Sequence, residues 1–184
     1  MTFIRMLAFT LVSVAASSNA MAPPSPYVGE QTRHIKALSD DEIDGLLKGK
    51  GLGFAKAAEL NGYPGPAHVL ELASELGLSS EQRRATEAIH SAMQARASQA
   101  GAALVAKERQ LDQSFAHRTI DTQALNALLH RIGELQAEIR TAHLEAHLAQ
   151  ARVLTTEQSA QYFVLRGYSE HSPPAGGSAS PHHH

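Results

Sequence analysis

Apolar residues in the second half of the chain recur with the spacing of an amphipathic helix. From Thr122 to about Val153 they occupy the two core positions of a seven-residue repeat. The first position holds Leu125, Ile132, Ile139, Ala146 and Val153, and the second holds Leu128, Leu135, Ala142 and Ala149. The pattern predicts one long helix with a continuous apolar face.

A second long helix is predicted just before it, from Ser79 to about Arg118. Its apolar residues recur every eleven residues, close to three helical turns, and so form a nearly straight stripe. The stripe has two lines, Leu78, Ile89, Ala100 and Leu111 in one and Met93, Leu104 and Phe115 in the other. The link from Thr119 to Asp121 is so short that the two helices should pack antiparallel. We therefore predict an all-α fold, an elongated antiparallel helical hairpin with shorter flanking helices.

Three helix starts share one signature, in which a Leu precedes Ser or Thr, and Glu or Gln follows three residues after the hydroxyl. They are Leu38-Ser39-Asp40-Asp41-Glu42, Leu78-Ser79-Ser80-Glu81-Gln82 and Leu154-Thr155-Thr156-Glu157-Gln158. The hydroxyl can accept a hydrogen bond from the third helical N–H, while the longer side chain accepts one from the N-cap N–H. Each signature therefore predicts a helix start, and Asp121 predicts a fourth.

Between the first two starts the chain is irregular. Residues 48–53 are too rich in glycine to remain helical, and a short helix is predicted over Phe54 to Leu60. Residues 61–66 then form a turn that is rich in Pro and Gly. Pro66 suits the first position of a helix that we expect to run through Leu76 and to be closed by Gly77.

The two ends of the chain differ from this helical region. Residues 1–20 have one early positive charge, a short apolar run and small residues before a cleavage position, which is typical of a secretory signal peptide. An uncleaved N-terminal anchor is the alternative. We expect residues 21–37 to be extended, 38–168 to form the helical domain and 169–184 to be a disordered tail. His182 to His184 is either a natural end or the remnant of an affinity tag.

Composition narrows the chemistry that the chain can perform. Lys and Arg number 16 against 18 for Asp and Glu, so there is no basic surplus for a nucleic acid partner. Cysteine is absent, which excludes disulfides, thiolate metal sites and a cysteine nucleophile. Aromatic residues make up only 5%, which favours close-packed helices rich in Ala and Leu. Metal chemistry would have to use His, carboxylates or Met.

The two signatures that end in Gln82 and Gln158 match the Leu-Thr-x-x-Gln motif, the first with Ser for Thr. With the signal peptide, the hairpin and the stretch Ala57-Ala58-Glu59-Leu60-Asn61-Gly62-Tyr63-Pro64-Gly65-Pro66, the chain resembles the Spy/CpxP and periplasmic heavy-metal-sensor family over about Gly53 to Tyr168. The resemblance implies a small helical periplasmic protein and often a homodimer. Members bind zinc, copper, nickel or cobalt, hold unfolded envelope proteins, or restrain a membrane-bound sensor or anti-sigma partner. This chain lacks the family's basic concave surface and Met-rich segments, which argues against potent general chaperoning.

Two histidines are the best candidates for binding a metal. His143 and His147 are four residues apart on the second long helix, so both imidazoles lie on one face and can reach one ion, a divalent transition metal. From the heptad position we expect the pair to be accessible, and two solvated histidines without a ligand role are the competing interpretation. A useful site needs a third ligand, which His68 and Glu71 could supply if their short helix docks beside His143. We expect His90 and His130 to be isolated surface or rim residues.

Leu144 and Leu148 place apolar surface on a second side of the same helix. We expect either the N-terminal helix around Ile43, Leu46 and Leu47 or a second copy or client protein to cover it. Enzyme signatures are absent from the sequence, including the Gly-x-Ser-x-Gly elbow, the phosphate loop and His-Glu-x-x-His. The sequence thus favours a non-enzymatic periplasmic metal-resistance or envelope-stress protein. The alternative is a helical interaction module that docks to one envelope partner and has no metal role.

Overall fold

The computed structural model describes residues 23–168, and this part of the chain is helical, without strands. The expected signal peptide and C-terminal tail lie outside the described residues. In chain order the elements are the 3-10 helix η1 (Glu30–Thr32) and the α-helices α1 (Asp40–Leu47), α2 (Lys56–Glu59), α3 (Pro66–Glu71), α4 (Ser80–Ala116), α5 (Thr122–Gln150) and α6 (Thr156–Leu165). Within residues 23–168, no helix is both long enough and apolar enough to span a membrane.

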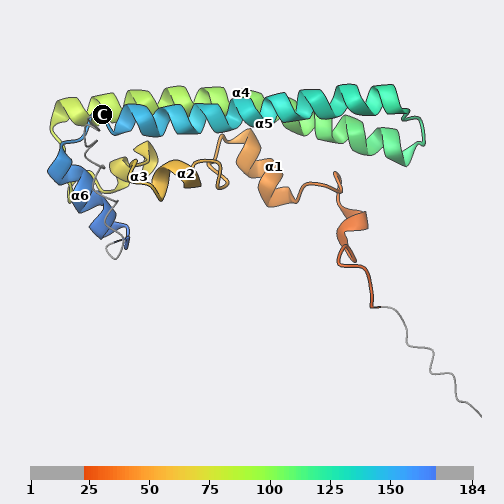
Figure 1. Cartoon of the computed structure of the whole chain (residues 1–184), viewed down its shortest axis with the longest axis horizontal. Coiled ribbons are helices and arrows are strands. Elements are labelled where there is room, and N and C mark those ends of the chain that lie inside the picture. The colour runs from red at the N-terminus through yellow and green to blue at the C-terminus, as the bar shows by residue number, and fades with distance from the viewer. Residues whose placement is uncertain (1–22, 169–184) are drawn as a thin grey trace, which may run out of the picture.

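The two long helices α4 and α5 lie side by side along the length of the molecule, and the shorter helices are arranged along one side of them (Figure 1). The predicted all-α hairpin is therefore confirmed. The heptad positions of α5 supply the centre of the core, where Ile132, Leu135 and Ile139 pack with Ala97 and Leu104 of α4. The eleven-residue stripe of α4 leaves the core near the hairpin tip, where Phe115 is 55% exposed.

All four predicted helix starts are capped as the sequence indicates. Ser39, Ser79 and Thr155 each accept a hydrogen bond from the N3 backbone N–H, and the N3 side chain accepts one from the N-cap N–H. At Asp121 the carboxylate accepts from the backbone N–H of Ala124 at 2.8 Å. Each box satisfies two backbone donors that a helix start leaves unpaired.

The two glutamines of the Leu-Ser/Thr-x-x-Gln signatures also join the starts of α4 and α6 to each other. The amide of Gln82 donates to Oε1 of Gln158 at 2.7 Å, and the amide of Gln158 donates back to Oε1 of Gln82 at 3.1 Å. Each amide also donates to a backbone carbonyl just before the other helix, that of Val153 or that of Leu76. Glu could form the capping box but has no N–H to donate. Gln therefore serves both the helix start and the contact between helices.

The segment before α2 is held close against α4. A Cβ at Gly101 of α4 would lie 2.2 Å from the carbonyl oxygen of Leu46, so only glycine permits this approach. Gly49 has φ +65°, and a Cβ there would lie 2.7 Å from the carbonyl oxygen of Gln94. Ile35, in the stretch expected to be extended, is fully buried in the core. These contacts anchor the N-terminal segment on the hairpin.

Two short helices are shorter than predicted. α2 covers only Lys56–Glu59, and α3 ends at Glu71, not at Leu76. Residues 72–77 form successive turns, in which Leu76 donates its backbone N–H to Leu72 and Gly77 donates to Ser74. Leu76 is buried there in a second apolar cluster with Val69, Leu154 and Tyr162. Packing against α6 thus outweighs the helical propensity of this stretch.

Candidate metal centre

A pocket of about 460 Å³ lies between the glycine-rich segment 48–53, the start of α3, and the helices α4 and α5. Side chains able to bind metal reach it from four different elements of the fold. They are Glu59 of α2, His68 of α3, His90 and Met93 of α4, and His143 and His147 of α5. The fold therefore gathers residues that lie far apart in the sequence around the predicted histidine pair.

His143 is buried in this pocket, with only 3% of its surface exposed. Its ring is nearly parallel to that of Phe54, with centroids 6.4 Å apart. Its Nε2 is buried and has no hydrogen-bond partner. Burial lowers the pKa of His143, the neighbouring His147 lowers it further, and the backbone of Lys50 acts in the opposite direction. Near neutral pH, His143 is therefore an uncharged imidazole.

His147 is 7% exposed and has a fixed orientation. Its Nδ1 donates a hydrogen bond to the backbone carbonyl of Tyr63 at 2.8 Å. In the neutral ring this places the proton on Nδ1 and the lone pair on Nε2. Histidines that bind metal commonly hold their second ring nitrogen in this way, because the hydrogen bond selects the tautomer.

Glu59 forms the wall of the pocket next to His147. Its Oε1 accepts a hydrogen bond from the hydroxyl of Tyr162 at 2.7 Å and lies 3.5 Å from Nε of Arg166. Its Oε2 lies 3.8 Å from Nδ1 of His147, and it is buried without a hydrogen-bond partner. One oxygen of the carboxylate is thus held by α6, and the other has no donor within the described part of the chain.

Gly65 leaves space between His147 and Glu59. A Cβ at Gly65 would lie 3.2 Å from Nε2 of His147 and 3.4 Å from Oε2 of Glu59. The backbone of Gly65 is extended, with φ −85°, a conformation open to any residue. A side chain here would therefore crowd the two neighbouring side chains, although the backbone angles would permit it.

The expectation that His143 and His147 are accessible is wrong. Residues 48–66 lie over this side of α5, and they bury both rings where the heptad position alone predicted solvent. His90, expected to be an isolated surface or rim residue, is half-buried and lines the same pocket. His130 does lie on the surface, beside Glu134.

Of the second predicted pair, His68 and Glu71, only His68 lines the pocket. His68 lines the pocket together with His143, whereas Glu71 does not line it and is largely exposed. Nδ1 of His68 lies 2.9 Å from a carboxylate oxygen of Glu71, so Glu71 orients His68 from outside. Glu59 was not predicted from the sequence, because it is at no ligand spacing from any histidine. Met93, which is three residues from His90 on α4, was also not predicted, because His90 was expected to be isolated. The turn at residues 61–66 was the one signal that the chain folds back at this point.

The apolar pair Leu144 and Leu148 lies next to the histidines on α5. Leu144 is half-buried, and Leu148 is 48% exposed. The N-terminal helix α1 packs mainly against α4, with Leu46 buried in the main core and Leu47 exposed. Among residues 23–168, therefore, α1 is not the cover that was expected for Leu148.

The donor set is suited to a divalent transition metal, since it offers imidazole nitrogens, one carboxylate and one thioether. The unpartnered Nε2 of His143 and the oriented Nε2 of His147 fit this role. Among the described residues, no group of three or more His, Asp or Glu side chains is already arranged to hold an ion. Binding would therefore require side chains that already line the pocket to move closer together.

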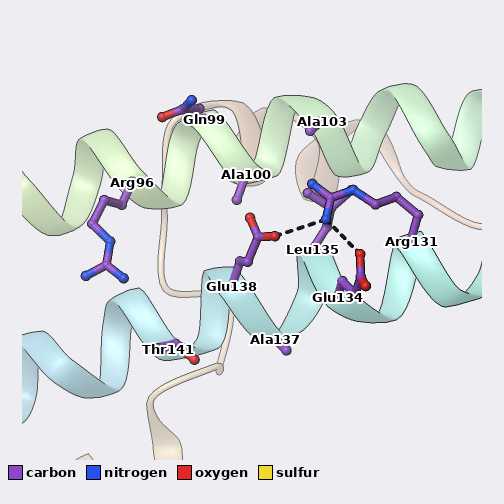
Figure 2. A pocket seen from close by; sticks show the side chains of 10 residues that line it. All are labelled: Arg96, Gln99, Ala100, Ala103, Arg131, Glu134, Leu135, Ala137, Glu138 and Thr141. Atoms are coloured by element: carbon purple, nitrogen blue, oxygen red, sulfur yellow. Dashed lines mark hydrogen bonds and ion pairs between the residues drawn. The ribbon is translucent and has the colours of Figure 1, made fainter.

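A larger cavity of about 760 Å³ is an open groove lined by α4 and α5 (Figure 2). Its charged side chains form ion pairs. Arg131 donates to Glu134 at 2.9 Å and to Glu138 at 3.1 Å. Arg96 donates at 2.6 Å to Glu145, which does not line the groove. The groove contains no histidine among its lining residues, and we assign it no metal role.

Comparison with known proteins identifies the family. The model of a family described as heavy-metal resistance matches residues 53–161, which include all the pocket side chains whose chemistry would allow them to bind a metal. Comparison with curated proteins and with solved structures gives no match. The matched region covers more than half of the chain, and the chain therefore belongs to the heavy-metal resistance family, the family of Spy/CpxP-like periplasmic metal-resistance proteins.

Proposed function

We propose that this protein serves heavy-metal resistance by binding a divalent transition metal, such as zinc, copper, nickel or cobalt, through His143 and His147. The observation that carries the proposal is the buried, unpartnered Nε2 of His143 beside the oriented ring of His147. Leaving a buried polar atom unpaired costs about 1–3 kcal/mol, so such an atom calls for a role. A metal ion supplies the missing partner.

The remaining ligands would come from side chains that already face the pocket. His68 is a candidate, because its side chain lines the pocket, is 39% exposed and contacts the exposed carboxylate of Glu71. Imidazole nitrogens suit zinc, copper, nickel and cobalt, and the neutral state of His143 keeps its lone pair available near pH 7. When bound, the metal supplies a positive charge that the neutral rings can stabilise.

The test is calorimetric titration with zinc and with copper(II). In every arm the protein is the full chain with His171, His182, His183 and His184 replaced by Ala, because histidines of the tail bind metal independently of the fold. The reference protein should bind with a defined stoichiometry, and the His143→Ala, His147→Ala double variant should lose this binding. The exposed His130→Ala variant is the matched control and should bind like the reference. Equal heats for the reference and the double variant would exclude the proposal.

We also propose a periplasmic location, because the family is periplasmic and residues 1–20 resemble a signal peptide. The exposed Leu148 supports contact with a partner, either a second copy in a homodimer or a client protein of the envelope. A membrane-bound sensor or anti-sigma partner would suit a metal-responsive protein. A helical interaction module without a metal role is the alternative, and calorimetry that shows no histidine-dependent binding favours it.

A further inference from the structure

We infer that Glu59 is an additional metal-binding residue, and that Tyr162 of α6 and Arg166 at its C-cap are its positioning residues, so that metal binding in the pocket is linked to docking of α6. The inference rests on the proposed function. It goes beyond the family match, because Tyr162 and Arg166 lie outside the matched residues 53–161. In this proposal the carboxylate ligand is Glu59, and not Glu71 as the sequence suggested.

The Glu59 carboxylate has only one of its two oxygens hydrogen-bonded. Its Oε2 is buried without a hydrogen-bond donor, and Glu59 lines the same pocket as His143, whose Nε2 is also buried and unpartnered. An acidic oxygen and an imidazole nitrogen that are both buried without partners in one cavity share a simple solution, which is a common cation. A buried hydrogen-bond donor could satisfy either atom alone, but a cation satisfies both.

The absence of a side chain at Gly65 leaves space beside His147 and Glu59. The position that a Cβ would occupy lies within 3.4 Å of both Nε2 of His147 and Oε2 of Glu59. Any side chain at residue 65 would therefore crowd both atoms. The chain thus keeps free the space in which a carboxylate oxygen and an imidazole nitrogen can approach one ion.

Tyr162 of α6 fixes the position of the Glu59 carboxylate. The Tyr162 side chain is fully buried, and its hydroxyl donates to Oε1 of Glu59 while accepting the backbone N–H of Gly65 at 3.3 Å. Burial, and then the hydrogen bond to Glu59, raises the pKa of Tyr162, so the hydroxyl remains a donor at every physiological pH. Arg166 adds a positive charge 3.5 Å from the same oxygen. Because the hydrogen bond from Tyr162 and the charge of Arg166 are both directed to Oε1, the other oxygen remains available to an ion.

Two consequences follow from this arrangement. An interaction that favours metal binding when α6 is docked must, by thermodynamic reciprocity, favour α6 docking when metal is bound. The proposed ligand set also has two imidazoles and one carboxylate, which suits Zn²⁺, Co²⁺ and Ni²⁺ better than Cu⁺. The pocket should therefore prefer these divalent ions to Cu⁺, and α6 should be the element that responds to the metal.

The experiment measures zinc affinity by calorimetry in the same tail-substituted full chain. Glu59→Gln keeps an oxygen that can accept from Tyr162 but removes the charge, and it should raise the Kd for zinc about tenfold or more. Glu75→Gln changes an exposed carboxylate outside the pocket and is the matched control, with an unchanged Kd. Gly65→Ala fills the space without altering a ligand and should also weaken zinc binding, which provides a second test if Glu59→Gln folds poorly.

The role of α6 has its own readout. Tyr162→Phe retains the buried ring but removes the hydroxyl, and it should raise the Kd for zinc by about fivefold, the lower end of coupling between sites. The exposed Tyr27→Phe variant is its control. Zinc should slow amide hydrogen exchange in α6 of the reference protein but not in Glu59→Gln. A purely structural Tyr162 would lower stability and leave the Kd for zinc unchanged.

The outcomes separate the two proposals. Reference-like zinc affinity in both Glu59→Gln and Gly65→Ala, with binding still lost in the His143, His147 double variant, would overturn the inference and leave the proposed function intact. No histidine-dependent binding in the reference protein would overturn the proposed function itself. Weaker binding in Glu59→Gln, with neither an effect of Tyr162→Phe nor a response of α6 to zinc, would refute the positioning role.

Discussion

The two cavities of this protein differ in what their polar atoms lack. The groove between α4 and α5 is the larger, at about 760 Å³ against about 460 Å³ for the histidine pocket. In the groove, charged side chains are partly exposed and pair with one another, as Arg131 does with Glu134 and Glu138. In the pocket, His143 and Glu59 each bury an atom without a partner. Unsatisfied buried atoms, and not cavity size, therefore mark the candidate site.

The cavities also depend on different parts of the chain. The groove is formed by α4 and α5 alone, so the hairpin is sufficient to make it. The pocket exists only because residues 48–66 cover α5, and close contact between Leu46 and Gly101 helps to anchor this cover. Variants that loosen the cover should damage the pocket and spare the groove.

The largest effect is expected from Gly101→Ala. Its Cβ would lie 2.2 Å from the carbonyl oxygen of Leu46, and backbone cannot be displaced as easily as the end of a side chain. Overpacking of this kind costs about 1–3 kcal/mol, which the gain in helix propensity offsets only in part. Urea unfolding followed by circular dichroism should show the loss of stability, and zinc affinity should fall with it.

Gly133→Ala is the matched control in the other long helix. Gly133 is exposed in α5, and a Cβ there would meet nothing within 4 Å. The same substitution should therefore stabilise the protein by about 0.5–1 kcal/mol. If both alanine variants were stabilised, the close contact between α1 and α4 would not exist in solution.

A smaller effect is expected from pH, and it should come from the pocket. The pKa of His143 is lowered in the folded state, mainly by burial, so the unfolded chain binds more protons as the pH falls. The metal-free protein should therefore be most stable above the ordinary histidine pKa of about 6.5 and should lose stability as the pH falls through it. Urea midpoints measured with a chelator at pH 7.5 and pH 5.5 test this.

His143→Gln identifies the source of that pH dependence. The variant removes the titrating ring and should show a smaller difference between the two urea midpoints than the unsubstituted protein. An unchanged difference would assign the pH dependence to other residues. It would favour the competing interpretation of the sequence, in which His143 and His147 are solvated and have no ligand role.

The hairpin could be predicted from the sequence because its determinants are local and periodic. The heptad of α5, the Ser, Thr and Asp caps and the short link at Thr119 to Asp121 each act within a few residues, and the structure confirms them. The Leu-Ser/Thr-x-x-Gln signatures indicated two caps, but the mutual hydrogen bonds of Gln82 and Gln158 span 76 residues and had no local signal.

The pocket could be predicted only in part, because it depends on contacts between distant segments. The spacing of His143 and His147 correctly placed them on one face, but their burial depends on how residues 48–66 fold over α5. Glu59 lies 84 or more residues away from both histidines, and Tyr162 reaches it from 103 residues away. No spacing rule connects such positions, so the predicted carboxylate was Glu71, the acid nearest His68 along the chain.

The smallest effect is expected in the groove, from Arg131→Gln. Arg131 is 44% exposed, and its partners Glu134 and Glu138 lie within two turns of the same helix, so solvent screens their attraction (Figure 2). The urea midpoint should change little, and zinc affinity should match that of the reference protein. A zinc affinity that fell in Arg131→Gln as far as in Glu59→Gln would show that paired surface charges matter as much as unpaired buried ones. The distinction drawn between the two cavities would then fail.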